Sequence, residues 1–581
     1  MKIIKAITHA MLLAGVVSSM PVLAANSGEV TFIHIGDIHG HLIPRPNLRS
    51  DATGKDAGGL ARMYTKIQDI RKHDKNTLLI NTGDTIQGSA EAMYTSGQAM
   101  VDVVNKFGID AFAAGNWDYV YGTERFLEFF GGNSAKAPWN AVAANLYYDG
   151  EPYADKSGRV LPPYLVKTVG KLKVGIMGFT TDRGPQVVGK TVTKGFRFTK
   201  GDDEVKEMIQ LLREKEKVDL VVMISELGLS NNIRLAEMNP GIDVLLSSDM
   251  HELTREPVVT RTGTVVLEEG QDGTVLGELS VNVRDGKMAK WKFKAHNIDS
   301  QIKEDKTIAA LVKEVRKSFV IGPDFKTHVN PFNNTVLTRP IDTVVGYTKV
   351  GLYRGNFTDE NMPGVIEGSS HDFLADAFRA QTGADIGAIR GFRYGTHIAP
   401  GPIKMEDIYH FMPIGPMIAK GTITGQALKK QIEGAADGSL NPDPHAWTGG
   451  WLFNFSGVTM DLNPYLSKGS RSSNIKVFNK TTNTWDKFDP NANYTYASYY
   501  YQRDPEFVNV LPASNIEVLK DEQGNPLDGV EVVVRYLQSL PDKTANPVLN
   551  RIKLLQPLPQ SRFGNREVQP VFGCPMTPSA N

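Results

Sequence analysis

The chain has 581 residues, of which 41% are hydrophobic and 22% charged, and 64 Lys and Arg balance 64 Asp and Glu. This length predicts two or more domains, and the composition is typical of an ordinary soluble globular protein. Because the formal net charge is zero, the composition gives no support to nucleic-acid binding.

The segment 1–24 has the pattern of a secretory signal peptide. A positively charged start precedes a short apolar stretch, and the small residues Val22 and Ala24 stand before an expected cut at Ala25. A membrane anchor is the alternative, but the apolar stretch is too short to span a bilayer. We therefore expect a periplasmic or secreted protein without a membrane anchor. Its single cysteine, Cys574, excludes an internal disulfide.

The first half of the chain alternates predicted strands and helices. Apolar residues share one helical face between Leu60 and Ile70 and again between Val205 and Leu212, where Asp202 is the expected helix cap. Alternation of this kind predicts a layered α/β domain, which we place at residues 25–303. The predicted strands are short β-rich runs that begin at Val30, Thr77, Asp110, Lys173, Val218 and Ile242.

A charged helical pattern begins at Glu304 and is followed by a turn-rich stretch. We interpret residues 304–340 as the join between two domains. The second domain, residues 341–557, is predicted to be α+β, with a tail at 558–581. One of its helices should begin at a Ser370 cap and end at Gly383.

Polar residues of one chemical kind follow the predicted strands of the first domain. In an α/β sheet the carboxyl ends of the strands line the ligand crevice, so these side chains can converge although they are far apart in sequence. Each alone could be a turn former, a loop histidine or a solvated charge, but their recurrence at successive strand ends favours one site. They are Asp37, His39, Asp84, Asn116, Glu226, Asp249 and His251.

These residue types suit a pair of divalent metal ions. Carboxylate and amide oxygens bind hard cations, whereas imidazole suits borderline ones. A single carboxylate such as Asp84 can bridge two ions. Two ions held roughly 3.5–4 Å apart can clamp a phosphoryl oxygen and generate a hydroxide nucleophile at neutral pH.

Three blocks, HIGDIHGH, NTGDTIQG and AGNWDYVYG, resemble the opening motifs of the calcineurin-like metallophosphoesterases, specifically the 5'-nucleotidase branch. The segment TGADIGAIRGFRYGTHIAPGPIKMEDIYHFMPIG resembles the C-terminal substrate-binding domain of that branch. The resemblance covers nearly the whole mature chain. It implies a layered α/β metallophosphoesterase domain, then an α+β 5'-nucleotidase C-terminal domain, and a two-metal hydrolase of small phosphoesters such as nucleotides or sugar nucleotides.

The resemblance also implies which residues bind the metals. Asp37, His39 and Asp84 match the ligands of one ion, with Asp84 as the bridge. Asn116 matches a ligand of the second ion and is an expected catalytic residue.

Three further ligand positions are atypical. Glu226 and Asp249 stand where the family usually has histidines, and His251 stands where it has Gln or His. The two exchanges let four carboxylates face two dications, which favours Mn²⁺, Mg²⁺ or Fe over Zn²⁺. They should also repel an anionic substrate and make a bound water less acidic.

The substrate positions depart from the family as well. Nucleotide-cleaving members carry His after the metal-binding Asn and Asp three residues later, whereas this chain has Trp117 and Val120. Trp has one N–H and no charge, so it cannot replace a histidine that stabilises the transferring phosphoryl group. The Trp117 ring should instead narrow the cleft beside the metals.

The second domain should supply the remaining substrate contacts. The resemblance implies that Arg393, a second expected catalytic residue, contacts the substrate phosphate or carboxylate, and Arg390 is a nearby candidate. Tyr501 aligns with one aromatic residue of the nucleoside clamp, but Ile414 replaces the other, so base stacking between two rings is not expected.

Two other functions remain open. The manganese thiosulfohydrolases of bacterial sulfur oxidation share the two-domain build, a Gly-Phe-Arg-aromatic-Gly-Thr block that GFRYGT from Gly391 resembles, and Trp near the metal-binding Asn. That function would require a carrier protein as partner. Alternatively, the domains could form a binding protein that keeps a metal or anion cleft without turnover.

Overall fold

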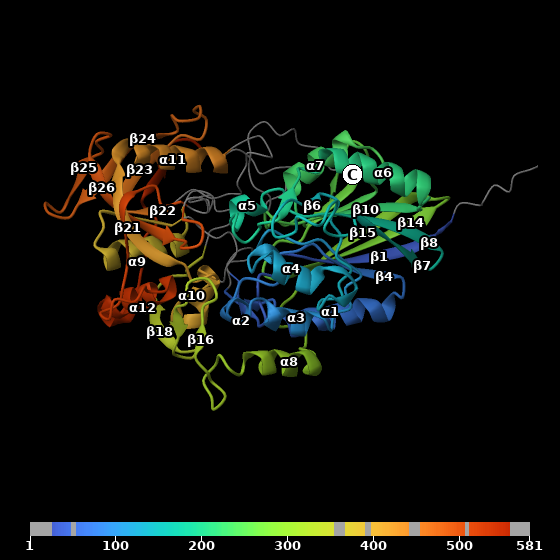
Figure 1. Cartoon of the computed structure of the whole chain (residues 1–581), viewed down its shortest axis with the longest axis horizontal. Helices are drawn as coiled ribbons and strands as arrows, with labels where there is room; N and C mark the ends of the chain where they lie inside the picture. Colours follow the sequence, from blue (N-terminus) through green and yellow to red (C-terminus); the bar gives the residue numbers. More distant parts are fainter. Residues whose placement is uncertain are drawn as a thin grey trace, which may run out of the picture.

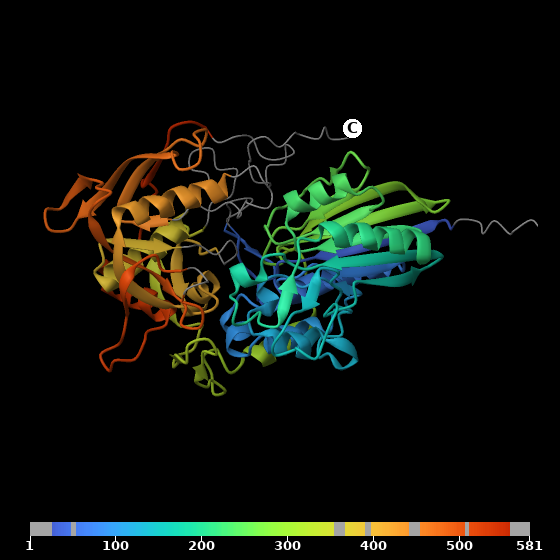
Figure 2. The same cartoon turned by 45° about the horizontal axis from the view of Figure 1, so that its top comes forward.

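A computed structural model describes residues 26–47, 54–353, 367–389, 397–440, 454–505 and 510–557, except for the side chain of Asn133. The expected signal segment 1–24, both candidate arginines Arg390 and Arg393, and the tail with Cys574 lie outside the described residues. The chain forms two domains that lie side by side, the first blue to green and the second yellow to red (Figures 1 and 2). No helix in the described part is both long and apolar enough to cross a bilayer.

Two β-sheets form the centre of the first domain. The first sheet has the order β15-β14-β1-β4-β5, in which β1, β4 and β5 are parallel. The second has the order β12-β13-β11-β10-β8-β7, in which β8, β10, β11 and β13 are parallel. The bounds are β1 (Gly28–Ile35), β4 (Thr77–Asn81), β5 (Ala111–Phe112), β7 (Tyr164–Val169), β8 (Leu172–Phe179), β10 (Leu220–Ser225), β11 (Val244–Ser247), β12 (Val258–Val259), β13 (Val265–Glu268), β14 (Val275–Arg284) and β15 (Lys287–Asn297).

The alternation of side chains along each strand explains why the sheets stack with helices outside. In β1, Val30 and Phe32 join a core shared with Ile224 of β10, whereas Ile33 and Ile35 face helices on the other side. Strands buried on both faces read as continuous apolar runs, which is the pattern of all six predicted strands. Those six strands and the layered α/β fold are confirmed. The covering helices are α1 (Leu60–His73), α2 (Ala90–Tyr94) and α3 (Gln98–Val104) on one side, and α6 (Asp202–Gln210) and α7 (Leu229–Met238) on the other.

The predicted cap of α6 is wrong. Gly201, at φ 85°, is the N-cap, and Asp202 is the first helical residue. Asp202 instead accepts a 2.7 Å hydrogen bond from Arg234 of α7. The acidic residue still opposes the positive end of the helix dipole.

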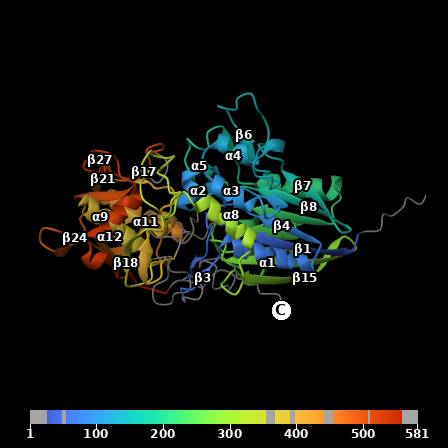
Figure 3. The ribbon, with the colours of Figure 1, turned by 90° about the horizontal axis from the view of Figure 1, so that it is seen from below.

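Helix α8 (Lys306–Arg316) begins at the charged pattern after Glu304, with Asp305 as its side-chain cap. It packs beside α1 and α3 (Figure 3). The chain then forms the pair β16 (His328–Val329) and β17 (Val336–Leu337) before it enters the second domain.

In its described part, the second domain combines mixed sheets with the α-helices α9 to α12. Helix α9 (Ser369–Thr382) packs on the sheet β22-β19-β26-β21-β27. Its N-cap is Gly368, so the predicted Ser370 cap is wrong, whereas Gly383 ends the helix in the left-handed conformation as predicted. The other elements are β18 (Val344–Thr348), β19 (Ile386–Ile389), β20 (Gly401–Lys404), α10 (Met405–Phe411), β21 (Met417–Thr424), α11 (Gly425–Ser439), β22 (Asn454–Ser456), β23 (Val458–Leu462), β24 (Ser472–Asn479), β25 (Thr484–Lys487), β26 (Asn493–Tyr500), β27 (Ser514–Val518), α12 (Gly529–Ser539), β28 (Thr544–Ala545) and β29 (Ile552–Leu554).

Buried charges join the two domains. Arg316 of α8 bridges Glu91 of the first domain and Glu406 of the second. Arg45 pairs with Asp407 nearby. These contacts join the two domains, and interdomain clefts are common ligand sites.

Candidate active site

The structure brings the seven predicted ligand positions together at the carboxyl ends of β1, β4, β5, β10 and β11. All seven side chains are buried, with at most 2% of each residue exposed. The parallel order of the two sheets causes this convergence, because each strand ends at the same edge of its sheet.

The backbone at this edge is unusual. Five of the seven residues have positive φ, at 46° for Asp37, 44° for His39, 45° for Asp84, 92° for Asp249 and 59° for His251. A non-glycine residue in this region costs on the order of 1–3 kcal/mol, and such residues concentrate at functional sites. The fold therefore holds these side chains in place at the expense of local stability.

Three donors form the first of two groups. Asp37 Oδ1 lies 3.4 Å from His39 Nε2 and 3.2 Å from His251 Nε2, and the two imidazole nitrogens are 2.9 Å apart. We call Asp37, His39 and His251 the imidazole group. Asp84 Oδ2 lies 3.6 Å from His39 Nε2, which places Asp84 at the side of this group.

A second cluster, which we call the carboxylate group, consists of Asp37, Asp84 and Glu226, each with an oxygen within 4.8 Å of the others. Asp37 is therefore common to both groups. Both oxygens of Glu226 and the amide oxygen of Asn116 lack a hydrogen-bond partner among the described residues. Buried acceptors without donors are costly, and a cation would satisfy them. These residues fit divalent metal ions.

Burial and mutual repulsion perturb the ionisation of this cluster. Burial, followed by the charges of Asp118 and Asp37, raises the pKa of Asp84 well above its usual value. Burial and then the charges of Asp84 and Asp37 raise the pKa of Glu226 in the same way. Burial lowers the pKa of His39 to about 3, so its imidazole is neutral and available as a donor. A bound dication reverses the carboxylate shifts, since it favours the charged form.

Asp249 is engaged differently from the other candidate ligands. Its Oδ1 accepts a 2.7 Å hydrogen bond from Asn116 Nδ2, and its Oδ2 accepts one of 2.7 Å from Arg183 Nη2. With Nδ2 directed at Asp249, the amide oxygen of Asn116 is left for a cation. The role of Asp249 as a direct metal ligand stays a prediction. Its hydrogen bond with Asn116 Nδ2 orients the Asn116 side chain.

Sequence reasoning missed Asp118, which organises the loop after β4. Its carboxylate accepts hydrogen bonds of 2.9–3.2 Å from the backbone N–H groups of Gly115, Asp84, Thr85 and Ile86. Gly115 is required beside it, because a Cβ there would lie 2.1 Å from Asp84 Oδ1. The position of Asp118, two residues after Asn116 in the same motif, was an available signal.

Sequence reasoning also missed Arg183. The segment from Thr180 to Asp182 connects the end of β8 to Arg183. Arg183 is the N-cap residue of the short helix α5 (Gly184–Val187). The rule that ligands gather at strand ends would have found it, because β8 was among the predicted strands.

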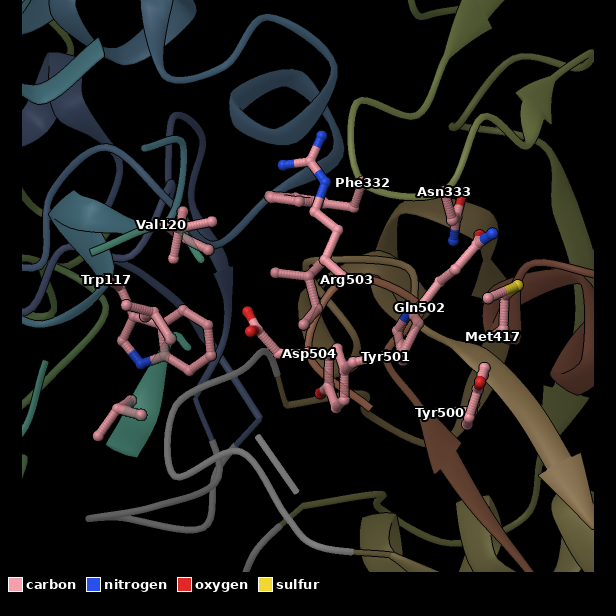
Figure 4. A pocket seen from close by; sticks show the side chains of 15 residues that line it. Trp117, Val120, Phe332, Asn333, Met417, Tyr500, Tyr501, Gln502, Arg503 and Asp504 are labelled. Atoms are coloured by element: carbon pink, nitrogen blue, oxygen red, sulfur yellow. The ribbon is translucent and has the colours of Figure 1, made fainter. Parts of the chain in front are cut away.

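A narrow cleft separates the domains beside Asn116. Trp117 and Val120 line one side, and Tyr501 and Asp504 face them from the second domain (Figure 4). Its cavity volume is about 50 Å³, room for a few water molecules. The predicted substrate residues Trp117 and Tyr501 thus meet in one cleft. Most of its remaining lining is apolar and includes Val187, Val188, Val192, Phe332 and Ile414.

The fold and the donor cluster define a two-domain, metal-dependent phosphoester hydrolase, and comparisons with known proteins specify the family. Residues 30–253 match the family model of the calcineurin-like phosphoesterases, and residues 344–506 match that of the 5'-nucleotidase C-terminal domain. The chain belongs to the calcineurin-like metallophosphoesterases that carry a 5'-nucleotidase C-terminal domain. Proteins of this class bind divalent metal ions.

Two relatives illustrate the range of similarity. The NAD 5'-nucleotidase of Haemophilus influenzae is 23% identical over 529 residues, which cover 81% of this chain and 84% of the relative. The trifunctional nucleotide phosphoesterase protein of Bacillus subtilis is 24% identical over 435 residues, which cover 70% of this chain but 27% of the relative.

Two solved structures from Thermus thermophilus share the fold, each with a TM-score of 0.73. One is a sulfate thiohydrolase, SoxB, which is 18% identical over 90% of this chain and 96% of that one. The other is a 5'-nucleotidase precursor, which is 20% identical over 91% of this chain and 100% of that one. Both matches establish the arrangement of the two domains.

Proposed function

We propose that this protein hydrolyses small phosphoesters, with nucleotides or sugar nucleotides as substrates, at a site that holds two divalent ions. One observation carries the proposal, namely the buried acceptors of Asn116 and Glu226 that have no partner among the described residues. They lie beside two further carboxylates at the carboxyl ends of parallel strands. Relatives named as nucleotidases and nucleotide phosphoesterases supply the substrate class.

Each ligand has a proposed place. Asp37, His39 and His251 would hold one ion and Asn116 and Glu226 the other, with Asp84 contributing to both, and Asp249 remains a predicted further ligand. When bound, the ions supply Lewis-acid charge at the phosphoryl oxygens and make a water molecule more acidic. We propose Mn²⁺, Mg²⁺ or Fe rather than Zn²⁺, because oxygen donors predominate around Glu226.

The protein's own groups bind and orient the ester. We propose that Arg393 and Arg390 contact the substrate phosphate or a carboxylate. Tyr501 and Trp117 contact the leaving group from opposite sides of the cleft that they line. Since the lining beside Trp117 is mostly apolar, it excludes water from the reacting ester.

The test combines metal content with a substrate panel. The purified protein, expressed from the whole chain, is analysed for bound metals and assayed with nucleotides, sugar nucleotides, an aryl phosphate and thiosulfonates. We expect about two divalent ions per chain and metal-dependent phosphate release. Sequencing of the mature N-terminus checks the proposed export to the periplasm or the medium, for which cleavage before Ala25 is expected. Absence of any metal-dependent phosphate release would refute the proposed reaction.

Sulfur-ester hydrolysis is a second candidate. Trp117 beside Asn116 and the GFRYGT sequence favour it, because both resemble features of the thiosulfohydrolases. Release of sulfate from a thiosulfonate carrier, with no phosphate released from nucleotides, would select this function and would require a carrier partner.

A further inference from the structure

Arg183 reaches the proposed active site from the end of β8. Its Nη2 donates a 2.7 Å hydrogen bond to Asp249, whose other oxygen accepts from Asn116. Arg183 is thus one hydrogen-bonded residue away from a proposed metal ligand. Two residues that line the cleft, Val187 and Val188, follow it closely along the chain.

The guanidinium keeps donors for a ligand. Its Nε lies 3.7 Å from Asp182 and its Nη2 is used by Asp249, while Nη1 has no hydrogen-bond or ion-pair partner among the described residues. The side chain is 22% exposed, whereas that of Asp249 is 1% exposed. One edge of the guanidinium is therefore fixed by Asp249, while the side chain as a whole keeps part of its surface exposed.

The charge around the site makes this cation important. Asp37, Asp84, Glu226 and Asp118 are buried together, and none of them forms an ion pair with Lys or Arg in the described part of the chain. Arg183 is the arginine that pairs with this cluster, through Asp249. It neutralises the charge that the replacement of a histidine by Asp249 would otherwise add. An anionic substrate consequently meets less repulsion than the sequence alone predicts.

We propose that Arg183 is a catalytic residue that contacts the oxygens of the transferring phosphoryl group, an assignment that rests on the proposed phosphoester hydrolysis. Water attacks phosphorus and loses one proton, the bond from phosphorus to the leaving oxygen breaks, and the leaving oxygen gains one proton. Arg183 stays protonated throughout and stabilises the charge on the remaining oxygens. Asp249 is a positioning residue that holds Arg183 and Asn116 on opposite oxygens.

This assignment supplies the cation that Trp117 cannot provide. The indole of Trp117 carries no charge, and the described arginine that lines the cleft, Arg503, donates to the carbonyl of Pro331 and lies over Phe332. Arg183 is tied instead to Asp249 beside Asn116. A fixed guanidinium fork binds two oxygens of a phosphoryl group at once.

The experiment compares Arg183→Gln, Arg183→Lys and Arg183→Ala with a matched control, Arg234→Gln. Arg234 is 24% exposed and lies 2.7 Å from Asp202 in an ion pair, so it matches Arg183 in exposure and pairing but sits on α7. Each metal-loaded variant is measured for metal content, for kcat and KM on an aryl phosphate, and for the Kd of inorganic phosphate by calorimetry.

We expect Arg183→Gln to keep its metals, to lower kcat by roughly 10²-fold, and to weaken phosphate binding by about tenfold. Arg183→Lys should recover only part of the loss, and added guanidinium should partly restore kcat in Arg183→Ala. The control should resemble the natural protein. Unchanged kcat and phosphate affinity in Arg183→Gln, or loss of its metals, would overturn the assignment. If the natural protein shows no turnover, the proposed hydrolysis is refuted. The Kd of inorganic phosphate in Arg183→Gln then still tests whether Arg183 binds a phosphoryl group.

Discussion

The two donor groups of the site share Asp37 but differ in kind. In the imidazole group, the nitrogens of two imidazoles lie within 3.4 Å of the Asp37 carboxylate. The carboxylate group places Asp84 and Glu226 together with no nitrogen donor, and neither oxygen of Glu226 has a hydrogen-bond partner among the described residues. The first group combines one carboxylate with two nitrogen donors, whereas the second consists of carboxylates alone and has the greater need of a cation.

This difference shows how a site can absorb an exchange of histidine for an acid. Asp249 is held between Asn116 and Arg183, so its charge is compensated by a residue from a different strand end. Glu226 has no such partner among the residues that the structure describes, so its charge is the one that a metal ion would compensate. Two similar exchanges in the sequence thus have different electrostatic consequences.

The largest effect should come from Asp84→Asn, because Asp84 belongs to the carboxylate group and also lies 3.6 Å from His39 of the imidazole group. We expect loss of most bound metal and a fall in kcat/KM of roughly 10³-fold or more, since several kcal/mol of metal-derived stabilisation disappear. Elemental analysis and steady-state kinetics measure both effects.

Asp243→Asn is the matched control for that change. Asp243 precedes β11 at its amino end and pairs with Arg213, away from the candidate ligands. We expect its metal content to be unchanged. Two ions still bound to the Asp84→Asn protein would show that Asp84 is not shared between the groups.

Asp118→Asn should destabilise the loop that carries Asp84. The Asp118 carboxylate accepts hydrogen bonds of 2.9–3.2 Å from backbone N–H groups. In the variant, the NH₂ group of the amide would point at some of these N–H donors and could not accept from them. Loss of two such bonds in a buried place costs about 2–4 kcal/mol. A lower denaturation midpoint together with weaker metal binding is expected. A variant as stable as the natural protein would indicate that these bonds do not hold the loop.

The sequence predicted the sheets and the seven converging positions well, for physical reasons. Strands buried on both faces are continuous apolar runs, and residues such as Asp84 and Glu226 follow them directly. Asp118 and Arg183 were missed because their roles depend on contacts made across loops. The cap predicted at Ser370 was misplaced, since Gly368, which precedes the first helical residue, starts the helix without a side-chain bond.

Trp117 offers a test on the cleft side of the carboxylate group. We expect Trp117→His alone to change turnover little, because Val120 cannot orient the new imidazole. The double change with Val120→Asp should raise phosphatase turnover by roughly 10²-fold. Both residues are at most 8% exposed and line the same cleft, so the smaller imidazole has room.

That prediction is checked by kcat on AMP and on an aryl phosphate, with metal content as the control. The natural protein should cleave AMP more slowly than good enzymes, below roughly 10 s⁻¹. If the double variant retains its metals but is no faster, Trp117 belongs to a site adapted to different chemistry, such as that of a sulfur ester.

The smallest effect should be a shift in metal preference, which a reciprocal exchange can measure. Glu226→His gives the carboxylate group a neutral nitrogen donor, and His251→Glu takes one from the imidazole group. Because imidazole suits Zn²⁺ better than carboxylate does, the first change should raise the bound ratio of Zn²⁺ to Mn²⁺ by about tenfold and the second should lower it. Competition between the two metals, followed by elemental analysis, gives the ratio directly.

The folded state of each variant must be verified first. Glu226 Oε1 lies close to Gly83, since a Cβ added to that glycine would be only 2.9 Å from it. An imidazole at position 226 fits only if it avoids Gly83. Opposite shifts would show that the donors in each group set its metal preference. Equal ratios in both folded variants would contradict the division of the site into two chemically different groups.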